Sequence, residues 1–547
     1  MNLTHTAAST ARSALQWSLL LFLIPALVLV TGCDSNGNGG IDDEEPADEE
    51  VGRLVEGPVD EDSTEVPVDY NGDGENEVVR VTDVNNNGVV PPGQGNKVTW
   101  TSDKIWELNG YVFVNPGDTL VIEEGTTVHG RLGGGSEASA LIVAAGGVIQ
   151  AEGSASAPIV FTSVRAADED LGRTRGLWGG VILLGDAPTN NGRQVAIEGV
   201  PDNTGARILY GGSNVDHDVG TFRYVSIRHT GTQLGNGDEI QGLTLGAVGS
   251  GSTIEYVESY ASNDDGYEWF GGTVNTRYLI AAWAADDSYD IDQGFRGSNQ
   301  FWLAVQGGDE AGRASEMDGA GDAGATPLAR SIVSNATYIG MGPGTSDVSG
   351  DANDPFLIHR DDNATSYYNS VFTGGRTNKG IQIEDLDGTV DAADRWDDPT
   401  TSEMGDGPLD HRSNSWYNIG PDYDAGAGFA PLVQVTRDDN GNASGDRGEN
   451  MIANLAGYLA DNGNELLSSS PLQGIDRGGN NGEVVTFNPT TSSAVSTTTI
   501  TPSDFGQRSA GVNDSFVSPN GRGAFAPGAQ WGDLSWTKLA SEGELTQ

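Results

Sequence analysis

The sequence of 547 residues predicts an all-β solenoid, a β-helix in which short strands stack in parallel from coil to coil. Glycine is very frequent, with 79 residues and no collagen period, and this suits a fold of many tight turns. Short β-branched runs separated by Gly, Asn, Asp and Pro recur along the chain, whereas long apolar stripes of helical period are scarce. Similar segments also repeat at intervals in the twenties, as stacked coils require.

The repeats indicate how the coils align. A shift of 29 residues aligns Gly117 with Gly146, and a shift of 22 aligns residues 264–268 with 286–290. A coil of two or three short strands cannot bury its apolar side alone, so neighbouring coils must close the core. We expect the β-helix over residues 97–430, with irregular insertions projecting from it as loops.

Residues 1–32 are typical of a lipoprotein signal peptide. Arg12 precedes an apolar run over 19–30, and small residues precede Cys33, the one cysteine of the chain. This arrangement predicts export rather than a membrane-spanning helix. Val-Thr-Gly-Cys at 30–33 resembles the bacterial lipobox, which implies lipidation of Cys33 and a membrane anchor. The alternative is an ordinary signal peptide with an uninvolved cysteine. We expect a protein anchored by lipid to the cell envelope, at the outer membrane or the cell surface.

Residues 33–65 contain almost no apolar side chains and a run of Asp and Glu. Such a segment cannot bury enough surface to fold, and its charges repel one another. We predict an acidic disordered tether that holds the folded body away from the membrane.

Residues 66–96 contain a pattern of oxygen side chains that resembles a short calcium loop. Asp69, Asn71 and Asp73 alternate, Gly74 permits a sharp turn, and Glu77 follows at the ninth position. Calcium prefers six to eight oxygen ligands, which such spacing can bring together. A turn without metal is the alternative.

Residues 431–547 are interpreted as an irregular C-terminal capping region. Residues 451–468 can form one short amphipathic helix, and Ser-, Thr- and Asn-rich turns follow. Trp531 and Trp536 are expected to cover the open end of the solenoid, where core residues would otherwise be exposed.

The charge is strongly acidic, with 28 basic against 79 acidic residues and a net charge of −51. This balance excludes nucleic acid as a partner, because phosphate binding needs a cationic surface. A well-hydrated acidic surface, as in proteins of salt-loving organisms, is one interpretation. A protein that collects divalent cations is another, and the two are compatible.

Several segments together resemble one protein family. They are Trp-Glu-Leu-Asn-Gly at 106–110, the Gly-Asp-Thr-Leu segment at 117–126, Pro-Ile-Val-Phe-Thr-Ser at 158–163, the Gly-Leu-Trp-Gly-Gly segment at 176–188, and Arg-Gly-Ala-Phe at 522–525 with Trp531 and Trp536. The family is a group of bacterial lipoproteins with a pectate-lyase-like right-handed parallel β-helix. The resemblance covers roughly residues 100–540. The group has no established activity, and its wider superfamily includes polysaccharide lyases, glycoside hydrolases, adhesins and inert scaffolds.

The region most able to carry chemistry lies between residues 263 and 318. Its candidate ligand or second cation site comprises Asp264, Asp265, Glu268, Asp286, Asp287, Asp290, Asp292 and Arg296. The 22-residue repeat stacks two carboxylate pairs about 4.8 Å apart, so they must be protonated, hydrated or bridged by a cation.

Three interpretations of this region stay open. The first is a pectate-lyase-like site, in which Asp residues hold Ca²⁺, Arg228, Arg277 or Arg296 acts as the base, and Tyr267 and Trp269 support the sugar. The second places the Asp residues in solvated turns or around a structural ion. The third is a ligand groove without catalysis.

No catalytic residue is assigned, and the six His residues show no zinc spacing. We expect a non-enzymatic β-helix scaffold that binds polysaccharide or an envelope protein at the cell surface, with Ca²⁺ as the stabilising ion. The alternatives are a calcium-dependent polysaccharide lyase or hydrolase, and an accessory lipoprotein of an outer-membrane transporter.

Overall fold

The computed structural model describes residues 78–82, 95–168, 171–235, 238–319, 325–345, 354–385, 391–396, 409–436, 447–478, 484–501, 516–518 and 520–546. Contacts divide the chain into residues 1–54 and 55–547, and all described residues belong to the second unit. The predicted signal peptide, Cys33, the acidic tether and the loop of Asp69, Asn71, Asp73 and Glu77 lie outside the described residues. Within the described part, no helix is both long enough and apolar enough to cross a membrane.

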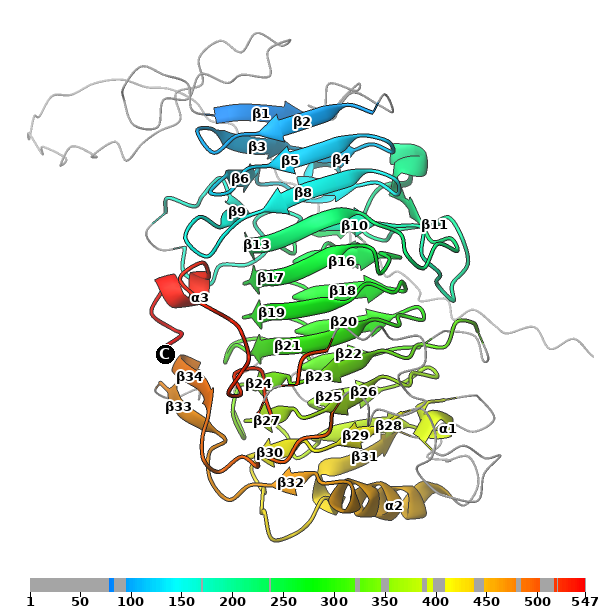
Figure 1. Ribbon diagram of the computed structural model, residues 1–547, viewed down its shortest axis with the longest axis vertical. Coiled ribbons are helices and arrows are strands. Elements are labelled where there is room, and N and C mark those ends of the chain that lie inside the picture. The colour runs from blue at the N-terminus through cyan, green and yellow to red at the C-terminus, as the bar shows by residue number, and fades with distance from the viewer. Residues whose placement is uncertain are drawn as a thin grey trace, which may run out of the picture. The chain divides into compact units, whose positions relative to one another are not determined.

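The fold is a parallel β-helix, as predicted, and its coils stack through two large parallel sheets (Figure 1). The smaller sheet has ten strands, one from each coil, and each pairs in parallel with the equivalent strand of the next coil. Its strands are β4 (Tyr111–Val114), β7 (Ala140–Val143), β10 (Val181–Leu184), β16 (Leu243–Gly246), β18 (Tyr267–Phe270), β20 (Tyr289–Asp292), β22 (Ser315–Met317), β25 (Leu357–His359), β28 (Ile381–Glu384) and β31 (Val433–Thr436).

The larger sheet has eighteen strands and wraps around two sides of each coil. The long strands β13, β17, β19 and β21 pass through both sides, and in the other coils two shorter strands replace each of them. Its strands are β1 (Val78–Thr82), β2 (Lys97–Trp100), β3 (Ile105–Asn109), β5 (Thr119–Ile122), β6 (Thr127–Gly130), β8 (Val148–Glu152), β9 (Ile159–Ser163), β13 (Gly220–Arg228), β17 (Thr253–Tyr260), β19 (Thr276–Ala282), β21 (Ser298–Val305), β23 (Ile332–Ser334), β24 (Thr337–Ile339), β26 (Ser366–Tyr368), β27 (Val371–Thr373), β29 (His411–Arg412), β30 (Ser415–Tyr417) and β32 (Glu465–Leu466).

The remaining elements are short hairpins and helices. The hairpins are β11 (Val195–Ala196) with β12 (Leu209–Tyr210), β14 (Gln233–Gly235) with β15 (Asp238–Glu239), and β33 (Leu472–Arg477) with β34 (Val484–Thr491). The α-helices are α1 (Ala392–Trp396), α2 (Arg447–Asp461) and α3 (Lys538–Ser541), and the 3-10 helices are η2 (Gly135–Glu137), η3 (Asp202–Ile208) and η4 (Ala430–Leu432).

The predicted repeats give the observed register. Leu120 pairs with Ile149 across the shift of 29, and Tyr267 pairs with Tyr289 across the shift of 22. Side chains alternate between the two faces of a strand, so every second residue enters the core. The interior is rich in aromatic rings. The ring centroid of Trp302 lies 5.0 Å from that of Trp269 and 4.4 Å from that of Tyr289.

A one-residue corner joins the two sides of the larger sheet in the middle coils. Tyr224, Tyr256, Tyr278 and Phe301 occupy this corner, and each has a left-handed backbone with φ between 51° and 61°. Such a backbone costs a residue with a side chain about 1–2 kcal/mol. The rings of Tyr224, Tyr256 and Tyr278 stack in one column at 4.5 and 4.3 Å, and these contacts offset part of that cost.

The two ends of the C-terminal region have different roles. Helix α2, predicted over 451–468 and observed over Arg447–Asp461, covers the last coil, because Met451, Leu455 and Leu459 join the main core (Figure 1). The expectation for Trp531 and Trp536 was wrong. They pack on the outer side of the larger sheet, where Trp531 contacts Tyr278 and Trp536 contacts Tyr224 in the same apolar cluster. The stack itself extends beyond the predicted range 97–430, from β1 to β32.

Candidate cation and ligand site

The carboxylates predicted as a ladder lie side by side on the smaller sheet. On β18 and β20, Tyr267, Trp269 and Tyr289 point into the core, so the alternate residues point outward. Glu268 pairs with Asp290 and Asp290 pairs with Glu316, which forms one row across three successive coils. The stacking predicted from the 22-residue repeat is therefore observed.

A second row lies in the turns that precede these strands. Asp265 and Asp287 are buried there, and the backbone N–H of Asp287 donates to Oδ1 of Asp265 at 2.8 Å. Asp264 accepts a hydrogen bond from Nε2 of Gln241 at 3.3 Å. The turn residues are thus fixed by hydrogen bonds and are less exposed than solvated turns would be.

The carboxylates form two sets in which oxygen atoms approach one another closely. One set is Asp265, Glu268 and Asp290, and the other is Asp264, Asp265 and Asp286. Within each set, one oxygen from every residue lies within 4.8 Å of the others. Two oxygens on opposite sides of a Ca²⁺ ion are about 4.6–5.2 Å apart, so this spacing suits calcium.

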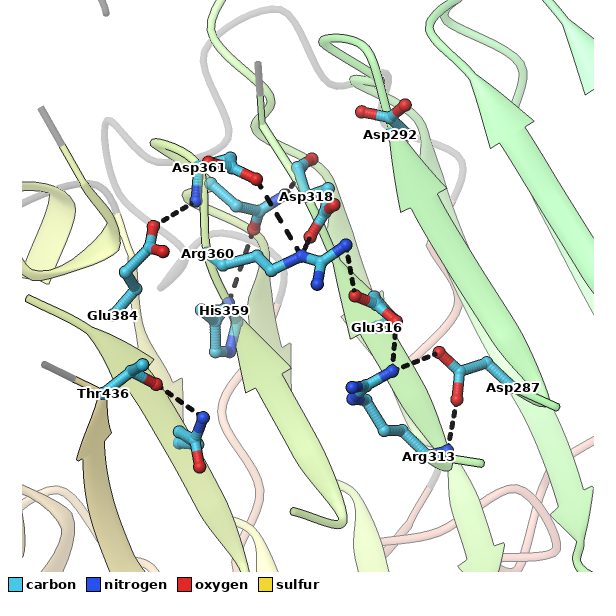
Figure 2. Close-up of polar contacts among 12 residues, drawn as sticks. Asp287, Asp292, Arg313, Glu316, Asp318, His359, Arg360, Asp361, Glu384 and Thr436 are labelled. Atoms are coloured by element: carbon cyan, nitrogen blue, oxygen red, sulfur yellow. Dashed lines mark hydrogen bonds and ion pairs between the residues drawn. The ribbon is translucent and has the colours of Figure 1, made fainter. Parts of the chain in front are cut away.

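Two arginines neutralise the part of the ladder that lies towards β25 (Figure 2). Nη1 of Arg313 lies 2.5 Å from Oε2 of Glu316 and 3.4 Å from Oδ2 of Asp287. Nε of Arg360 lies 2.5 Å from Oδ1 of Asp318, and its Nη2 lies 2.8 Å from Oε1 of Glu316. Burial opposes the charge of both guanidinium groups, but the adjacent carboxylates outweigh it and raise the pKa of Arg313 and of Arg360.

The part formed by β18 and β20 is compensated much less, since Arg360 acts on Asp290 only through its charge and without an ion pair. Among the described residues, no basic side chain forms an ion pair with Asp265, Glu268 or Asp290. Oε2 of Glu268 and Oδ1 of Asp290 are buried and accept no hydrogen bond from any described residue. Three converging carboxylates with unused buried oxygens are a donor set that a hard divalent cation fits.

Electrostatics agree with this geometry. Burial, with a further contribution from nearby carboxylates, raises the pKa of Asp265, Glu268 and Asp290 well above the ordinary carboxyl range. Burial and the carboxylate of Glu239 raise the pKa of Asp264 to about 7, and burial raises the pKa of Asp292 to about 6. Without a cation, Asp265, Glu268 and Asp290 therefore favour their protonated forms near neutral pH, whereas Asp264 is about half ionised and Asp292 mostly ionised there.

Neighbouring segments limit the polar face at one end. Ile142, Ile182 and Leu184 occupy the outer face of the earlier strands and pack against the insertion that carries β11, η3 and β12. The row continues onto β16 as Thr244, and its carboxylates begin at β18. Glu198 from the insertion accepts a hydrogen bond from Gln241 beside Asp264.

Several expectations for individual residues need correction. Tyr267 and Trp269 are fully buried in the core and cannot support a sugar, because the strand alternation turns them inward. Arg228 and Arg277 belong to β13 and β19 of the larger sheet.

Arg296 follows β20, and the structure does not bring it into the carboxylate ladder. Burial alone lowers its pKa, and no carboxylate contributes. Its Nε has no hydrogen-bond partner among the described residues.

Sequence reasoning missed the partners Arg313 and Arg360 and the buried pair His359 and His411. The Nε2 atoms of the two His rings lie 3.0 Å apart, although the residues are 52 positions apart in the sequence. Only the coil-to-coil register could have revealed these pairs, because the insertions between these later strands vary in length.

One of three comparisons with known proteins, the match to a family, agrees with the fold. Residues 93–393 match the family described as pectate-lyase like beta helix domain. A search among curated proteins gave no match. A crystal structure of alginate lyase from Paenibacillus sp. str. FPU-7 is 14% identical and has a TM-score of 0.22, with 64% of this chain and 96% of that chain covered.

Proposed function

Because the chain belongs to the family of pectate-lyase-like β-helix domains, we propose that it binds an anionic polysaccharide through a divalent cation on the smaller sheet, without cleaving it. The observation that carries the proposal is the convergence of Asp265, Glu268 and Asp290, in which Oε2 of Glu268 and Oδ1 of Asp290 are buried and accept no hydrogen bond from a described residue. Asp264 and Asp286 extend the same acidic surface through the shared Asp265.

The cation, when bound, would offer coordination positions to sugar carboxylates. Calcium takes six to eight oxygens, and three protein carboxylates leave several positions open to a ligand. The outward row passes from coil to coil along the stack, which suits a linear polymer better than a compact small molecule. Arg360, whose side chain is 40% exposed, can donate to a further ligand carboxylate at the end of the row.

The arginines support binding rather than bond cleavage. Removal of a proton beside a sugar carboxylate needs a basic group that is free of its own proton. Arg313 and Arg360 are held as cations by Glu316 and their other carboxylate partners. A calcium-dependent lyase or hydrolase is the second candidate, favoured by family membership and by the lowered pKa of Arg296.

Calorimetric calcium titration of the purified protein tests the cation site. Glu268→Gln and Asp290→Asn should each weaken one calcium-binding event by at least about tenfold, because each removes one charged ligand of about three. Glu124→Gln removes an exposed carboxylate elsewhere and should leave the titration unchanged. Equal titrations for all four proteins would contradict the proposed site. A parallel Asp69→Ala, Asp73→Ala variant separates any calcium bound by the N-terminal loop.

Polysaccharide binding is tested by co-sedimentation with polygalacturonate and alginate, with calcium or with EGTA. Binding that needs calcium and is lost in Glu268→Gln supports the proposal. Formation of unsaturated sugar products that stops in Arg296→Ala would instead establish the lyase.

We further propose that the protein is exported and anchored by a lipid on Cys33 at the cell envelope, as the lipobox-like tetrad suggests. Metabolic labelling with a fatty acid should mark the wild-type chain and should fail for Cys33→Ala. Equal labelling of both proteins would contradict the anchor.

A further inference from the structure

The C-terminal segment 520–546, called the strap here, lies along the outer side of the larger sheet (Figure 1). It passes the coils in the reverse of their order in the sequence. Gly523 donates to the carbonyl of Asn369, Ala524 to Thr337, and the carbonyl of Gln530 accepts from Tyr256. One continuous segment therefore touches coils that are not neighbours in the stack.

The aromatic column is one anchor of the strap. Trp531 meets the edge of Tyr278 at 5.2 Å, and Trp536 meets Tyr224 at 5.8 Å. Both tryptophans are almost fully buried, at 3% and 1% exposure. The strap thus removes from water an apolar surface that the coils alone would leave exposed.

A buried carboxylate on β17 is the second anchor. Glu258 is fully buried, and its oxygens accept hydrogen bonds from the backbone N–H groups of Lys538 and Leu539 at 2.7 and 3.1 Å. Ser226 on β13 donates to the same carboxylate at 2.5 Å. The strap is therefore needed to satisfy a charge that belongs to the coils.

The end of the strap is the third anchor. Glu544 receives two hydrogen bonds from Arg173, at 2.9 and 2.7 Å, and a third from Nε1 of Trp283 at 3.1 Å. The backbone N–H of Phe487 on β34 donates to the carbonyl of Glu544 at 2.8 Å. This end joins an insertion, a coil corner and a hairpin that are far apart in the sequence.

We propose that the strap is a coupling device that makes the coils from β13 to β24 unfold as one unit. Coils of a solenoid contact only their neighbours, so such a stack can lose structure coil by coil. A segment fixed to several coils changes this, because no coil beneath it can open without breaking contacts shared with the others.

Hydrogen exchange of the full chain, read strand by strand, tests the proposal. In the wild type, β13, β17, β19 and β21 should exchange at a common rate. In Trp531→Ala, Trp536→Ala, the rates should spread by about tenfold or more, which is the change that losing one or two ordinary interactions produces.

The matched control is Trp100→Ala, which removes a buried indole from β2 outside the strap. It should lower the unfolding midpoint while the four strands keep their common rate. If the double variant does not fold, Glu544→Gln weakens the third anchor with almost no change in volume and should give the same spread on a smaller scale. Common exchange rates in the strap variants, with only a lower midpoint, would overturn the proposal.

Discussion

The two halves of the carboxylate ladder are built from the same residue types and differ in their partners. Beside β22 and β25, Glu316 and Asp318 contact Arg313 and Arg360 at ion-pair distances. Beside β18 and β20, Glu268 and Asp290 have buried oxygens without a partner among the described residues. The carboxylates of the first half are therefore balanced by arginines of the protein itself, whereas the second half is suited to an added cation. The comparison shows that a row of carboxylates is a candidate cation site where no arginine forms an ion pair with it.

The half beside β22 and β25, with its arginine ion pairs, is called the paired half. Removing an arginine from it should have the largest effect on stability. Arg313→Met should lower the free energy of unfolding by about 3–5 kcal/mol, because it leaves the carboxylate of Asp287 buried without a cation and leaves Glu316 with Arg360 alone. Chemical denaturation at neutral pH measures the change. Asp290→Asn is the matched variant in the other half, and without calcium it should be neutral or stabilising. A loss of stability in Asp290→Asn as large as that in Arg313→Met would remove the distinction between the halves.

The pH dependence of stability should differ with calcium. The pKa of Asp264 is raised to about 7 and that of Asp292 to about 6, and burial is the main cause in both. A carboxyl with a raised folded pKa contributes stability that is complete below the unfolded pKa of about 4 and is lost as pH rises through the folded value.

In EGTA, the melting temperature should therefore fall by about 5 °C or more between pH 5 and pH 8, because several such groups lose protons. Calcium should remove most of this fall, since the cation replaces the protons. Thermal scans at the two pH values, with and without calcium, test it, and parallel curves in both conditions would contradict it.

The smallest expected effect concerns the His pair beneath the paired half. Burial lowers the pKa of His411 to about 3 and that of His359 well below its usual value. The stability from these neutral rings is complete above the unfolded pKa of about 6.5 and is lost as pH falls towards the folded values.

His411→Phe keeps the ring stacked on Tyr367 but removes the partner of His359. It should cost about 1–3 kcal/mol at pH 7, with the deficit shrinking between pH 7 and pH 5, because only the wild type has two rings that resist protonation. Denaturant titrations at both pH values would show this, and a constant deficit would argue that the rings do not titrate.

The parts of the fold that follow a regular repeat could be predicted from sequence. The shifts of 22 and 29 residues gave the strand register, and with it the contact between residues 264–268 and 286–290. The capping helix was also expected, but the predicted range 451–468 starts four residues late and ends seven residues late against the observed Arg447–Asp461.

The rest depends on contacts that no local pattern records. Arg313 lies 26 residues after Asp287, and Arg360 lies 42 after Asp318, because insertions of different lengths separate those coils. The direction of Tyr267 and Trp269 depended on which strand face was buried, and alternation alone leaves both choices open. The position of the strap was predicted wrongly, because no pattern in its sequence indicates that it returns along the side of the stack.

The left-handed corner at Tyr224, Tyr256, Tyr278 and Phe301 restricts how this chain can vary. One residue makes the turn there, and its ring is stacked between the rings of adjacent coils, so an inserted residue would break both the column and the cover provided by the strap. Length changes are left to the other corners, which flank the smaller sheet and its carboxylates. The middle coils thus have one side with a fixed corner length and one side where new loops can be added. We expect changes in ligand preference among such chains to arise in the loops of the second side.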